Sequence, residues 1–457
     1  MSVKQPLYTF LFCGKNDLMM KQIKTIFLIL TMSLLLLNSL QAQATPKIQT
    51  WTTSNGARVL FVPSTTLPMV DVRVVFDAGS ARDAGHSGLA VLTNGLLAEG
   101  AAKMSSQAIA EAFESVGAQF DNDALRDMAI VSLRSLTDKK YLTKAMTTFR
   151  KVLTRPDFPP RAFGRVLKQM KVDVRAGEQS PGSIASKAFY RAIYGKHPYA
   201  SPVSGTLDSL NKLTVNEVRI FYQKYYVAKN ATIAIVGKLT RAQAETLVKR
   251  LMSSLPAGEK APALPPVKPL TAAKTIRINF PSSQTHILEG QVGVKRGDRD
   301  YFDLYMGNQP FGGSGFSSRL VKVIREQNGL VYSVYSYFAP MRVAGPFVMG
   351  MQTRTAKADK ALGLLNAQLK KYLLHGPTKA ELKQSKENVI GSFPLSLDSN
   401  SKLLGYIAMI GFYHLPIDYL DHFVDNVKAV KLADVDAALK RRIHADKMVT
   451  VIVGKLK

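Results

Sequence analysis

The spacing of apolar positions predicts strands and helices in both halves of the chain. Continuous or alternating apolar runs are typical of strands, whereas apolar positions three and four residues apart are typical of helices. Strands are predicted at Arg58–Val62, Val70–Phe76, Ala231–Val236, Ile276–Phe280, His286–Val294, Val331–Phe338, Phe347–Met351 and Met448–Val453. Helices are predicted at Gly88–Leu97, Ser105–Val116, Thr137–Leu153, Pro160–Ala176, Lys357–Leu374 and Lys379–Ile390. Strands grouped before helices indicate an α+β fold with a largely antiparallel sheet in each half.

Two matching segments indicate an internal duplication. The sequence of Ile235–Leu239 recurs unchanged at Ile452–Leu456, each time at the end of a β-rich run that follows a helical segment. Between the copies, Leu255–Leu270 is rich in proline, which neither helices nor sheets accommodate. We therefore predict two tandem duplicated α/β sandwich domains, residues 45–254 and 271–457, joined by a semi-rigid linker at 255–270.

The first 44 residues have the order of an export signal. Lys21 and Lys24 precede the apolar run Thr25–Leu37, and Ala42–Ala44 forms a small-x-small cleavage site. The apolar run is too short to cross a bilayer. We predict that residues 1–44 are a cleaved signal peptide, with Met20 as an alternative start, rather than a buried N-terminal helix. The mature protein is then expected to be exported, to the periplasm of a bacterium, without a membrane span.

Charge and cysteine content narrow the function further. The chain has 61 Lys and Arg against 33 Asp and Glu, a net charge of +28. Strong positive charge often indicates nucleic-acid binding, but here the basic residues are scattered, so we expect peptides or an acidic partner and no nucleic acid. The single cysteine, Cys13, lies in the predicted signal peptide. The mature chain is therefore expected to have no disulfide, thiolate metal site or cysteine nucleophile.

Common catalytic motifs are missing, but three stretches look specific. No two of the seven histidines lie within five residues of each other, so no helix can present two imidazoles to one zinc ion at positions i and i+4. The chain also lacks a Gly-x-Ser-x-Gly elbow, a Walker A loop and a complete Gly-x-Gly-x-x-Gly fingerprint. The three specific stretches are Gly85–Gly100, Gly195–Thr206, and the glycine-rich Phe311–Leu320 followed by Arg325–Phe338.

Together these stretches resemble the pitrilysin or insulinase family of zinc peptidases, in particular the two-domain type related to the mitochondrial processing peptidase. The resemblance covers essentially the whole mature chain and implies a clamshell arrangement of the two domains. In active members the first stretch would read Gly-Leu-x-His-x-x-Glu-His, in which the histidines bind zinc and the glutamate activates water. Aligned on Gly88–Ala90, this chain has Val91, Asn94 and Gly95 at those three positions.

The remaining candidates for metal binding are weak. The helix that would supply a third, glutamate ligand offers only Asp173, and we interpret His86, five residues before the motif position, as a loop residue. Without bound zinc there is no route to a hydroxide at neutral pH. We therefore expect no catalytic residue, no metal and no cofactor in this chain.

The resemblance also implies a substrate-binding role for the second half. An Arg and a Tyr seven residues apart would hold the substrate backbone, and Arg325 and Tyr332 have this spacing. We expect a helix over Ser317–Gln327 to carry Arg325 and to end at Gly329, so that Tyr332 returns close to it. The other candidate substrate-binding residues are Gly312, Gly313, Gly315 and Phe316. The alternative is an ordinary helix arginine, a tyrosine packed in the core and a tight glycine turn.

Our leading hypothesis is a non-catalytic, zinc-less subunit that pairs with a zinc-bearing homologous peptidase to degrade peptides. Zinc would then be the cofactor of the partner. Two alternatives stay open, a peptide-binding or scaffold protein without an enzymatic partner, and an active zinc endopeptidase whose ligands the motifs do not reveal.

Overall fold

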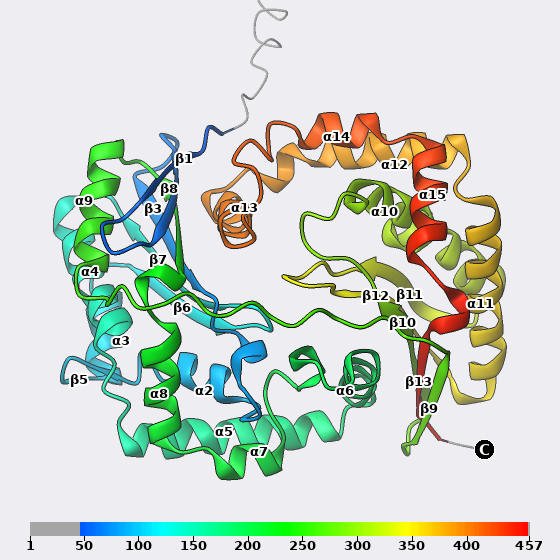
Figure 1. The fold of residues 1–457 in the computed structure, drawn as a ribbon, viewed down its shortest axis with the longest axis horizontal. Coiled ribbons are helices and arrows are strands. Elements are labelled where there is room, and N and C mark those ends of the chain that lie inside the picture. Colours follow the sequence, from blue (N-terminus) through cyan, green and yellow to red (C-terminus); the bar gives the residue numbers. More distant parts are fainter. Residues whose placement is uncertain (1–45, 456–457) are drawn as a thin grey trace, which may run out of the picture. The chain divides into compact units, whose positions relative to one another are not determined.

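The computed structural model of the chain describes residues 46–455, so the predicted signal peptide lies outside the described residues. Two sheets, each covered by helices, form the framework of these residues (Figure 1), which confirms the predicted mixture of helix and sheet. No helix within residues 46–455 is both long enough and apolar enough to cross a bilayer.

The first sheet has six strands in the order β1-β2-β8-β3-β7-β6. Its strands are β1 (Gln49–Thr52), β2 (Arg58–Pro63), β3 (Met69–Phe76), β6 (Gln119–Ala124), β7 (Ala129–Leu136) and β8 (Ala231–Gly237). Only β2 and β8 pair in parallel, and the other neighbours are antiparallel. A separate two-stranded ribbon joins β4 (Gly100–Ala101) to β5 (Met104–Ser105).

The second sheet has five strands in the order β11-β12-β10-β13-β9. Its strands are β9 (Lys274–Asn279), β10 (Gln284–Val292), β11 (Val331–Phe338), β12 (Pro346–Arg354) and β13 (Val449–Gly454). Only β13 and β9 pair in parallel. Without β1, the strands of the first sheet lie side by side in the chain order first, last, second, fourth, third. The second sheet has the same order when it is read from β9, and the parallel pair is at the same position in both sheets. This shared topology confirms the duplication.

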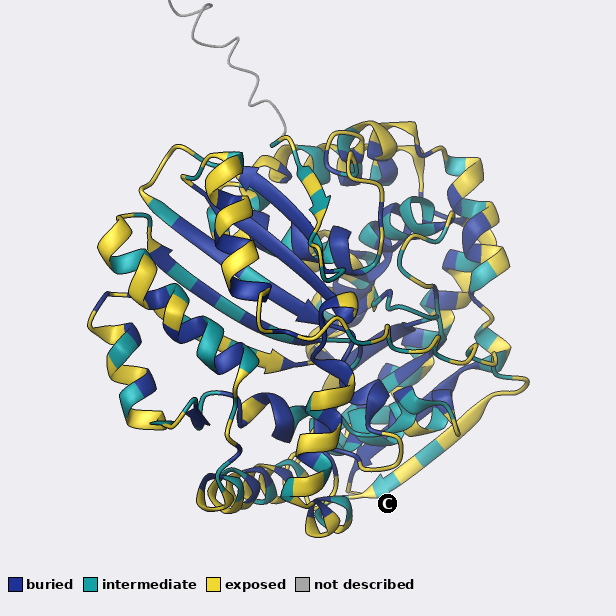
Figure 2. Cartoon of the chain, turned by 60° about the vertical axis from the view of Figure 1, so that its left-hand side comes forward, coloured by how far each residue is buried: buried dark blue, intermediate teal, exposed yellow. Residues whose placement is uncertain are grey.

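Helices cover both sheets. Those of the first half are α2 (Leu89–Gly95), α3 (Ser106–Glu114), α4 (Lys139–Thr154), α5 (Pro160–Glu178), α6 (Pro181–Tyr194), α7 (Leu207–Lys212), α8 (Val215–Tyr225) and α9 (Arg241–Met252). Those of the second half are α10 (Tyr301–Asn308), α11 (Ala358–His375), α12 (Lys379–Ser392), α13 (Asn400–Phe412), α14 (Phe423–Ala429) and α15 (Leu432–Arg442). In Figure 2 the strands of the first sheet are largely buried, whereas the helices in front of them alternate buried and exposed positions.

Each half lends one helix to the sheet of the other half. Helix α6 packs on β10 and β13 of the second sheet, and α13 packs on β2, β3 and β8 of the first. Two glycines allow this close approach, because a Cβ on Gly290 would lie 3.0 Å from the Phe189 ring, and a Cβ on Gly411 would lie 2.6 Å from Leu60. The hydrophobic cores are therefore shared between the halves.

Strand β2 shows how the sequence builds two cores on one sheet. Side chains of neighbouring strand residues point to opposite faces. Val59 and Phe61 lie in the core of the first half, whereas Leu60 and Val62 lie in a core formed mainly by residues of the second half. Both faces of the strand are buried, which explains its continuous apolar run.

The proline-rich segment contains neither helix nor strand from Pro256 to Leu270. It is attached to the first half along its length. Pro256 and Ala257 accept hydrogen bonds from the backbone N–H groups of Ala228 and Lys229 at 2.8 and 2.9 Å, and Arg82 donates to the carbonyl of Pro262 at 2.7 Å. The segment is thus fixed against the first half.

Candidate functional site

Helix α2 carries Val91, Asn94 and Gly95, the three positions that the resemblance assigns to the zinc motif. It follows Gly88, whose positive φ of 96° suits glycine. The buried carboxylate of Asp83 accepts hydrogen bonds from the N–H groups of Gly88 and Ala90 at 2.9 and 2.8 Å, which satisfies the first turn of the helix. Burial raises the pKa of this carboxyl to about 7, although the two hydrogen bonds limit the rise.

The three motif positions are part of the packing of the first half. Asn94 is buried, and its amide donates to the Ile130 carbonyl and the Tyr226 hydroxyl, both at 3.2 Å. Its side-chain oxygen accepts a hydrogen bond from Asn122 at 2.9 Å. Val91 is half-buried against the same hydrophobic core, and Gly95 has no side chain to offer. This set does not fit a zinc ion, because it provides neither an imidazole nor a carboxylate.

The remaining metal-binding candidates are engaged elsewhere. His86 lies in the turn before α2, and its Nδ1 is 2.7 Å from Glu217, which also caps helix α8. Asp173 is exposed on α5 and accepts a hydrogen bond from Gln169 at 2.9 Å. Within residues 46–455, no group of three or more His, Cys, Asp or Glu side chains could hold a metal ion.

The second half brings Arg325, Phe316 and Tyr332 together. The Arg325 guanidinium lies 4.9 Å from the centre of the Phe316 ring and 5.2 Å from that of Tyr332, as in cation–π contacts. Phe316 is 74% exposed and Tyr332 83% exposed, so neither ring is packed in the core. Among the described residues the guanidinium has no ion pair or hydrogen bond. We call these three residues the Arg325 cluster.

Local backbone geometry explains how Tyr332 becomes exposed. Gly329, with a φ of 58°, ends the helical segment, and β11 begins two residues later. Val331 pairs with Thr353 and Ser333 pairs with Gln352, which leaves Tyr332 as the extra residue of a β-bulge. A bulge redirects a side chain at the edge of a sheet. The sequence pattern does not reveal this bulge.

The predicted helix over Ser317–Gln327 is only partly correct. Gly315–Ser317 forms a 3₁₀ turn, Ser318 has extended backbone, and the segment Val321–Gln327 that carries Arg325 is a π-helix. The Ser318 carbonyl accepts a hydrogen bond from Lys322 N–H at 3.0 Å. The helix therefore starts after Ser318, because this residue acts as its N-terminal cap.

The predicted substrate-binding glycines have different environments. A Cβ on Gly312 would lie 2.7 Å from the backbone nitrogen of Ser336, and one on Gly313 would lie 2.7 Å from the side-chain nitrogen of Asn308. These two glycines let the loop pack against β11 and α10. Gly315 has a positive φ of 60° and open space around it.

A cavity of about 170 Å³ lies between α6 and strands β10, β11 and β12 of the second sheet. Gly182 and Ser186 of α6 line one side, and Tyr335, Tyr337 and His286 line the other. Burial lowers the pKa of His286, which favours its neutral form. Elements of both halves thus meet beside the strand that carries Tyr332.

A buried carboxylate that the sequence does not reveal connects the halves. Asp127 accepts hydrogen bonds from the backbone N–H of Arg342 at 2.8 Å, from the Tyr413 hydroxyl at 3.0 Å, and from the Tyr199 hydroxyl. Tyr199 belongs to the specific stretch Gly195–Thr206. The two tyrosines have strongly raised pKa values, mainly because they are buried. The hydroxyl of Tyr199 in this stretch therefore takes part in the contact between the two halves.

Two family models match consecutive parts of the chain. The model described as "Insulinase (Peptidase family M16)" matches residues 58–207, and the model described as "Peptidase M16 inactive domain" matches residues 212–389. The crystal structure of a peptidase M16 inactive domain from Pseudomonas fluorescens is similar with a TM-score of 0.87 and 39% identity, over 90% of this chain and 98% of that chain.

Curated relatives are named both as zinc proteases and as a non-peptidase homologue. The "Uncharacterized zinc protease YmxG" of Bacillus subtilis is 24% identical over 409 residues, 89% of this chain and 98% of the relative. The "Non-peptidase homolog YmxG" of Helicobacter pylori is 24% identical over 403 residues, 87% of this chain and 92% of the relative.

Proposed function

Since this chain belongs to the insulinase family of peptidases, family M16, we propose that it is the zinc-less subunit of an exported heterodimeric metallopeptidase. It would contribute peptide binding through its second half, while a zinc-bearing homologous subunit would supply the metal and the base. Export to the periplasm rests on the N-terminal sequence alone.

One observation carries this proposal, the contrast between the two candidate sites in the same chain. The positions that the resemblance assigns to the zinc ligands and the base are a half-buried valine, a hydrogen-bonded asparagine and a glycine, so these three positions offer no group that could hold a metal or activate water. The Arg325 cluster, in contrast, offers a cation and two exposed rings. The absence of zinc-ligand side chains at these positions, together with the exposed cation and rings of the Arg325 cluster, supports the proposal of a subunit that binds peptides but does not hydrolyse them.

The chemistry of the cluster suits a peptide backbone. A guanidinium is a rigid fork of donors for a carbonyl or carboxylate, and a phenol can donate to an oxyanion that develops in the transition state. The exposed Phe316 ring provides an apolar contact for a substrate side chain. Bound in this way, a peptide would be held at the second half while the partner attacks it.

The deciding experiment compares the mature chain alone with the chain mixed with a zinc-bearing family member from the same organism. We expect the chain alone to bind no stoichiometric zinc and to cleave no member of a fluorogenic peptide library, and the mixture to cleave peptides. One zinc per chain with chelator-sensitive cleavage by the chain alone would contradict the proposal and indicate an active endopeptidase. A pull-down that retains peptides but no zinc-bearing homologue would indicate a peptide-binding or scaffold protein instead.

A further inference from the structure

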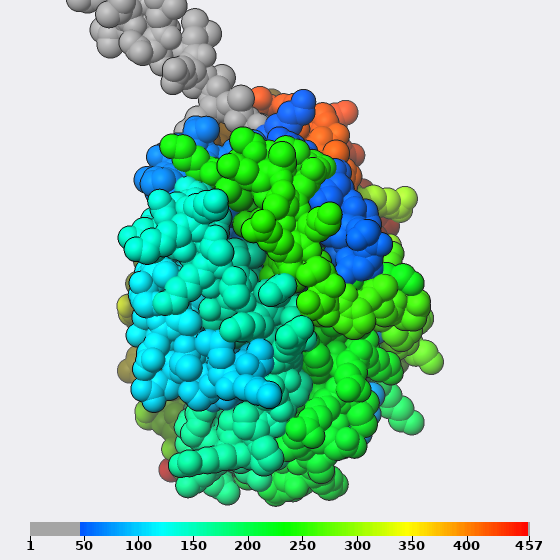
Figure 3. All heavy atoms as spheres, turned by 90° about the vertical axis from the view of Figure 1, so that its left-hand side faces the viewer, coloured from blue at the N-terminus to red at the C-terminus, as the bar shows by residue number. Residues whose placement is uncertain are grey.

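A groove of about 540 Å³ lies between helices α4 and α9 in the first half. The two helices are in contact and lie side by side on the face of the molecule shown in Figure 3. The volume falls within the range of about 300–1,000 Å³ that is typical of small-molecule sites. Neither the three zinc-motif positions of α2 nor the Arg325 cluster contributes to its lining.

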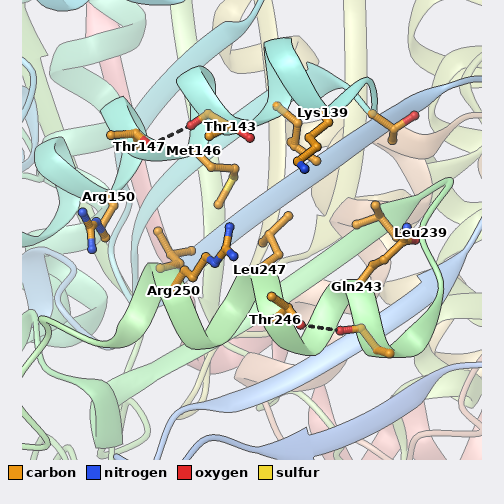
Figure 4. A pocket seen from close by; sticks show the side chains of 14 residues that line it. Lys139, Thr143, Met146, Thr147, Arg150, Leu239, Gln243, Thr246, Leu247 and Arg250 are labelled. Carbon is orange, nitrogen blue, oxygen red and sulfur yellow. Dashed lines mark hydrogen bonds between the residues drawn. The ribbon is translucent and has the colours of Figure 1, made fainter.

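Apolar side chains and internally hydrogen-bonded threonines form the walls of the groove. Leu142, Met146 and Leu247 lie along it, and Figure 4 shows Met146 and Leu247 extending toward each other from the two helices. Thr147 donates its hydroxyl to the Thr143 carbonyl at 2.7 Å. Thr246 does the same to the Ala242 carbonyl at 2.9 Å. Because both hydroxyls are satisfied within their own helices, these threonines require no polar ligand.

Three cationic side chains line the groove. Arg150 lies toward one end of the groove, and the Arg250 guanidinium lies between Arg150 and Lys139 in the view of Figure 4. Within the described part of the chain, none of the three side chains forms a hydrogen bond or an ion pair. Since no Asp or Glu lines the groove, its charge is unbalanced.

Neighbouring groups do not neutralise this charge. Glu245 on α9 is paired with Arg241 at 2.6 Å, and Asp138 caps the first turn of α4. The backbone carbonyls of Arg150 and Arg250 accept hydrogen bonds from the hydroxyls of Thr154 and Ser253 at 2.8 and 3.0 Å, and among the residues that the structure describes neither carbonyl binds a guanidinium. The two guanidiniums are therefore available to an external anion.

We propose that this groove binds an anionic amphiphile, a long-chain carboxylic acid, with its alkyl chain along Met146 and Leu247 and its carboxylate at Arg150 and Arg250. Guanidinium is the side-chain group best matched to the two oxygens of a carboxylate. Each buried methylene strengthens binding about fourfold, so an apolar groove selects a long chain. An acidic amphipathic helix of another protein would also meet cations and apolar residues, but a groove of about 540 Å³ is within the size range of small-molecule sites, which favours the amphiphile.

The first test measures the binding of small probes to the mature protein by isothermal titration calorimetry, below the micelle concentration of each probe. We expect laurate to bind at one site. Hexanoate, which is six methylenes shorter, should bind at least about 100-fold more weakly. Dodecyltrimethylammonium, which keeps the chain but reverses the charge, should not bind. Equal affinity for laurate and this cation, or no binding of laurate, would overturn the proposal.

The second test uses paired substitutions that remove the same charge. The double variant Arg150→Gln/Arg250→Gln should bind laurate about tenfold more weakly or worse, because it loses both charged donors. The control Arg161→Gln/Arg175→Gln changes two exposed arginines on α5 and should bind laurate like the wild type. Equal losses in the two double variants would show a nonspecific charge effect and overturn the proposal.

A third variant and a competing probe test the apolar wall and the nature of the occupant. Met146→Gln keeps the length of the side chain but should weaken laurate binding, provided that thermal melting shows an intact fold. An acidic amphipathic helical peptide serves as the competing probe. If the peptide binds through Arg150 and Arg250 while laurate does not, the groove is a protein docking site and the proposal is wrong. This inference does not depend on the proposed peptidase partner.

Discussion

Helix α2 and the Arg325 cluster differ in what their polar groups contact. In α2, Asn94 is buried. Its side-chain nitrogen donates to Ile130 and Tyr226, and its side-chain oxygen accepts from Asn122. In the cluster, Arg325 contacts only aromatic rings, two of the most exposed in the described residues. The polar groups of Asn94 are thus engaged in packing, whereas the donors of the Arg325 cluster are exposed. One chain therefore ties the polar groups of Asn94 into internal packing in one half and leaves a cation and two aromatic rings exposed to ligands in the other half.

The largest effect should come from removing a donor of the Arg325 cluster in the assembled pair. Arg325→Ala and Tyr332→Phe are each expected to lower the rate of peptide cleavage on the order of 10²-fold, as for other positioned oxyanion donors. Unfolding free energy should change by less than about 1 kcal/mol. Steady-state kinetics and urea unfolding measure the two effects. Lys322→Ala, an exposed change on the same helical segment, is the control and should leave the rate unchanged.

Normal cleavage rates in both variants would show that the Arg325 cluster has no role in peptide cleavage. A large loss of stability would instead support a packing role and remove the contrast with α2.

Asn94 should behave in the opposite way. Asn94→Ala leaves the buried Tyr226 hydroxyl and the Ile130 carbonyl without this partner, so we expect a loss of about 1–3 kcal/mol in unfolding free energy. Urea unfolding measures this loss. Asn328→Ala, an exposed asparagine of the second half, is the matched control and should cost clearly less. Similar losses in the two variants would show that the hydrogen bonds of α2 contribute little.

The pH dependence of stability tests the cap of α2. Because the pKa of Asp83 in the folded protein is raised to about 7, the folded state keeps a proton that the unfolded state releases near pH 4. Stability from this group is therefore greatest at low pH and falls as pH rises toward about 7, above which the dependence ends. We expect Asp83→Asn to lose less unfolding free energy than the wild type between pH 5 and pH 8. Parallel losses in urea unfolding would contradict this assignment.

The smallest effect on stability is expected at Phe316. This ring is 74% exposed, so Phe316→Ala should change the unfolding free energy by no more than about 0.5 kcal/mol. Peptide affinity should fall only about a few-fold, since the exposed ring offers a substrate side chain one partial apolar contact. Thermal melting and titration with a cleavage-resistant peptide measure the two quantities. A drop in melting temperature like that of Asn94→Ala would show that Phe316 packs more closely than its exposure indicates.

Most of the fold could be predicted from local patterns. The repeat at Ile235–Leu239 and Ile452–Leu456 reveals the duplication, because its strands occupy the same place in both sheets. The pattern gives no strand prediction for residues 119–136, which form β6 and β7. Strand β6 lies at the edge of its sheet and is mostly polar, with only Phe120 and Ala124 apolar, so its apolar signal is weak.

The site was less predictable than the fold. The spacing of Arg325 and Tyr332 correctly indicates that these side chains meet, since a helical turn followed by a tight reversal returns the strand to the helix. The bulge at Tyr332 and the hydrogen bonds of Asp127 depend on residues distant in sequence. The exchange of α6 and α13 is also invisible locally, because an apolar helix face does not specify which sheet it covers.

The exchange of α6 and α13 has a consequence for the order of folding during synthesis. When the first 254 residues have been made, the first sheet still lacks α13, and α6 still lacks β13, which ends only at Gly454. At about 5–20 residues per second, roughly 10–40 seconds separate these events. Until α13 and β13 have been made in turn, the nascent chain leaves an apolar sheet face and an apolar helix face without their partners. The protein therefore reaches its native core only when nearly the whole chain is available.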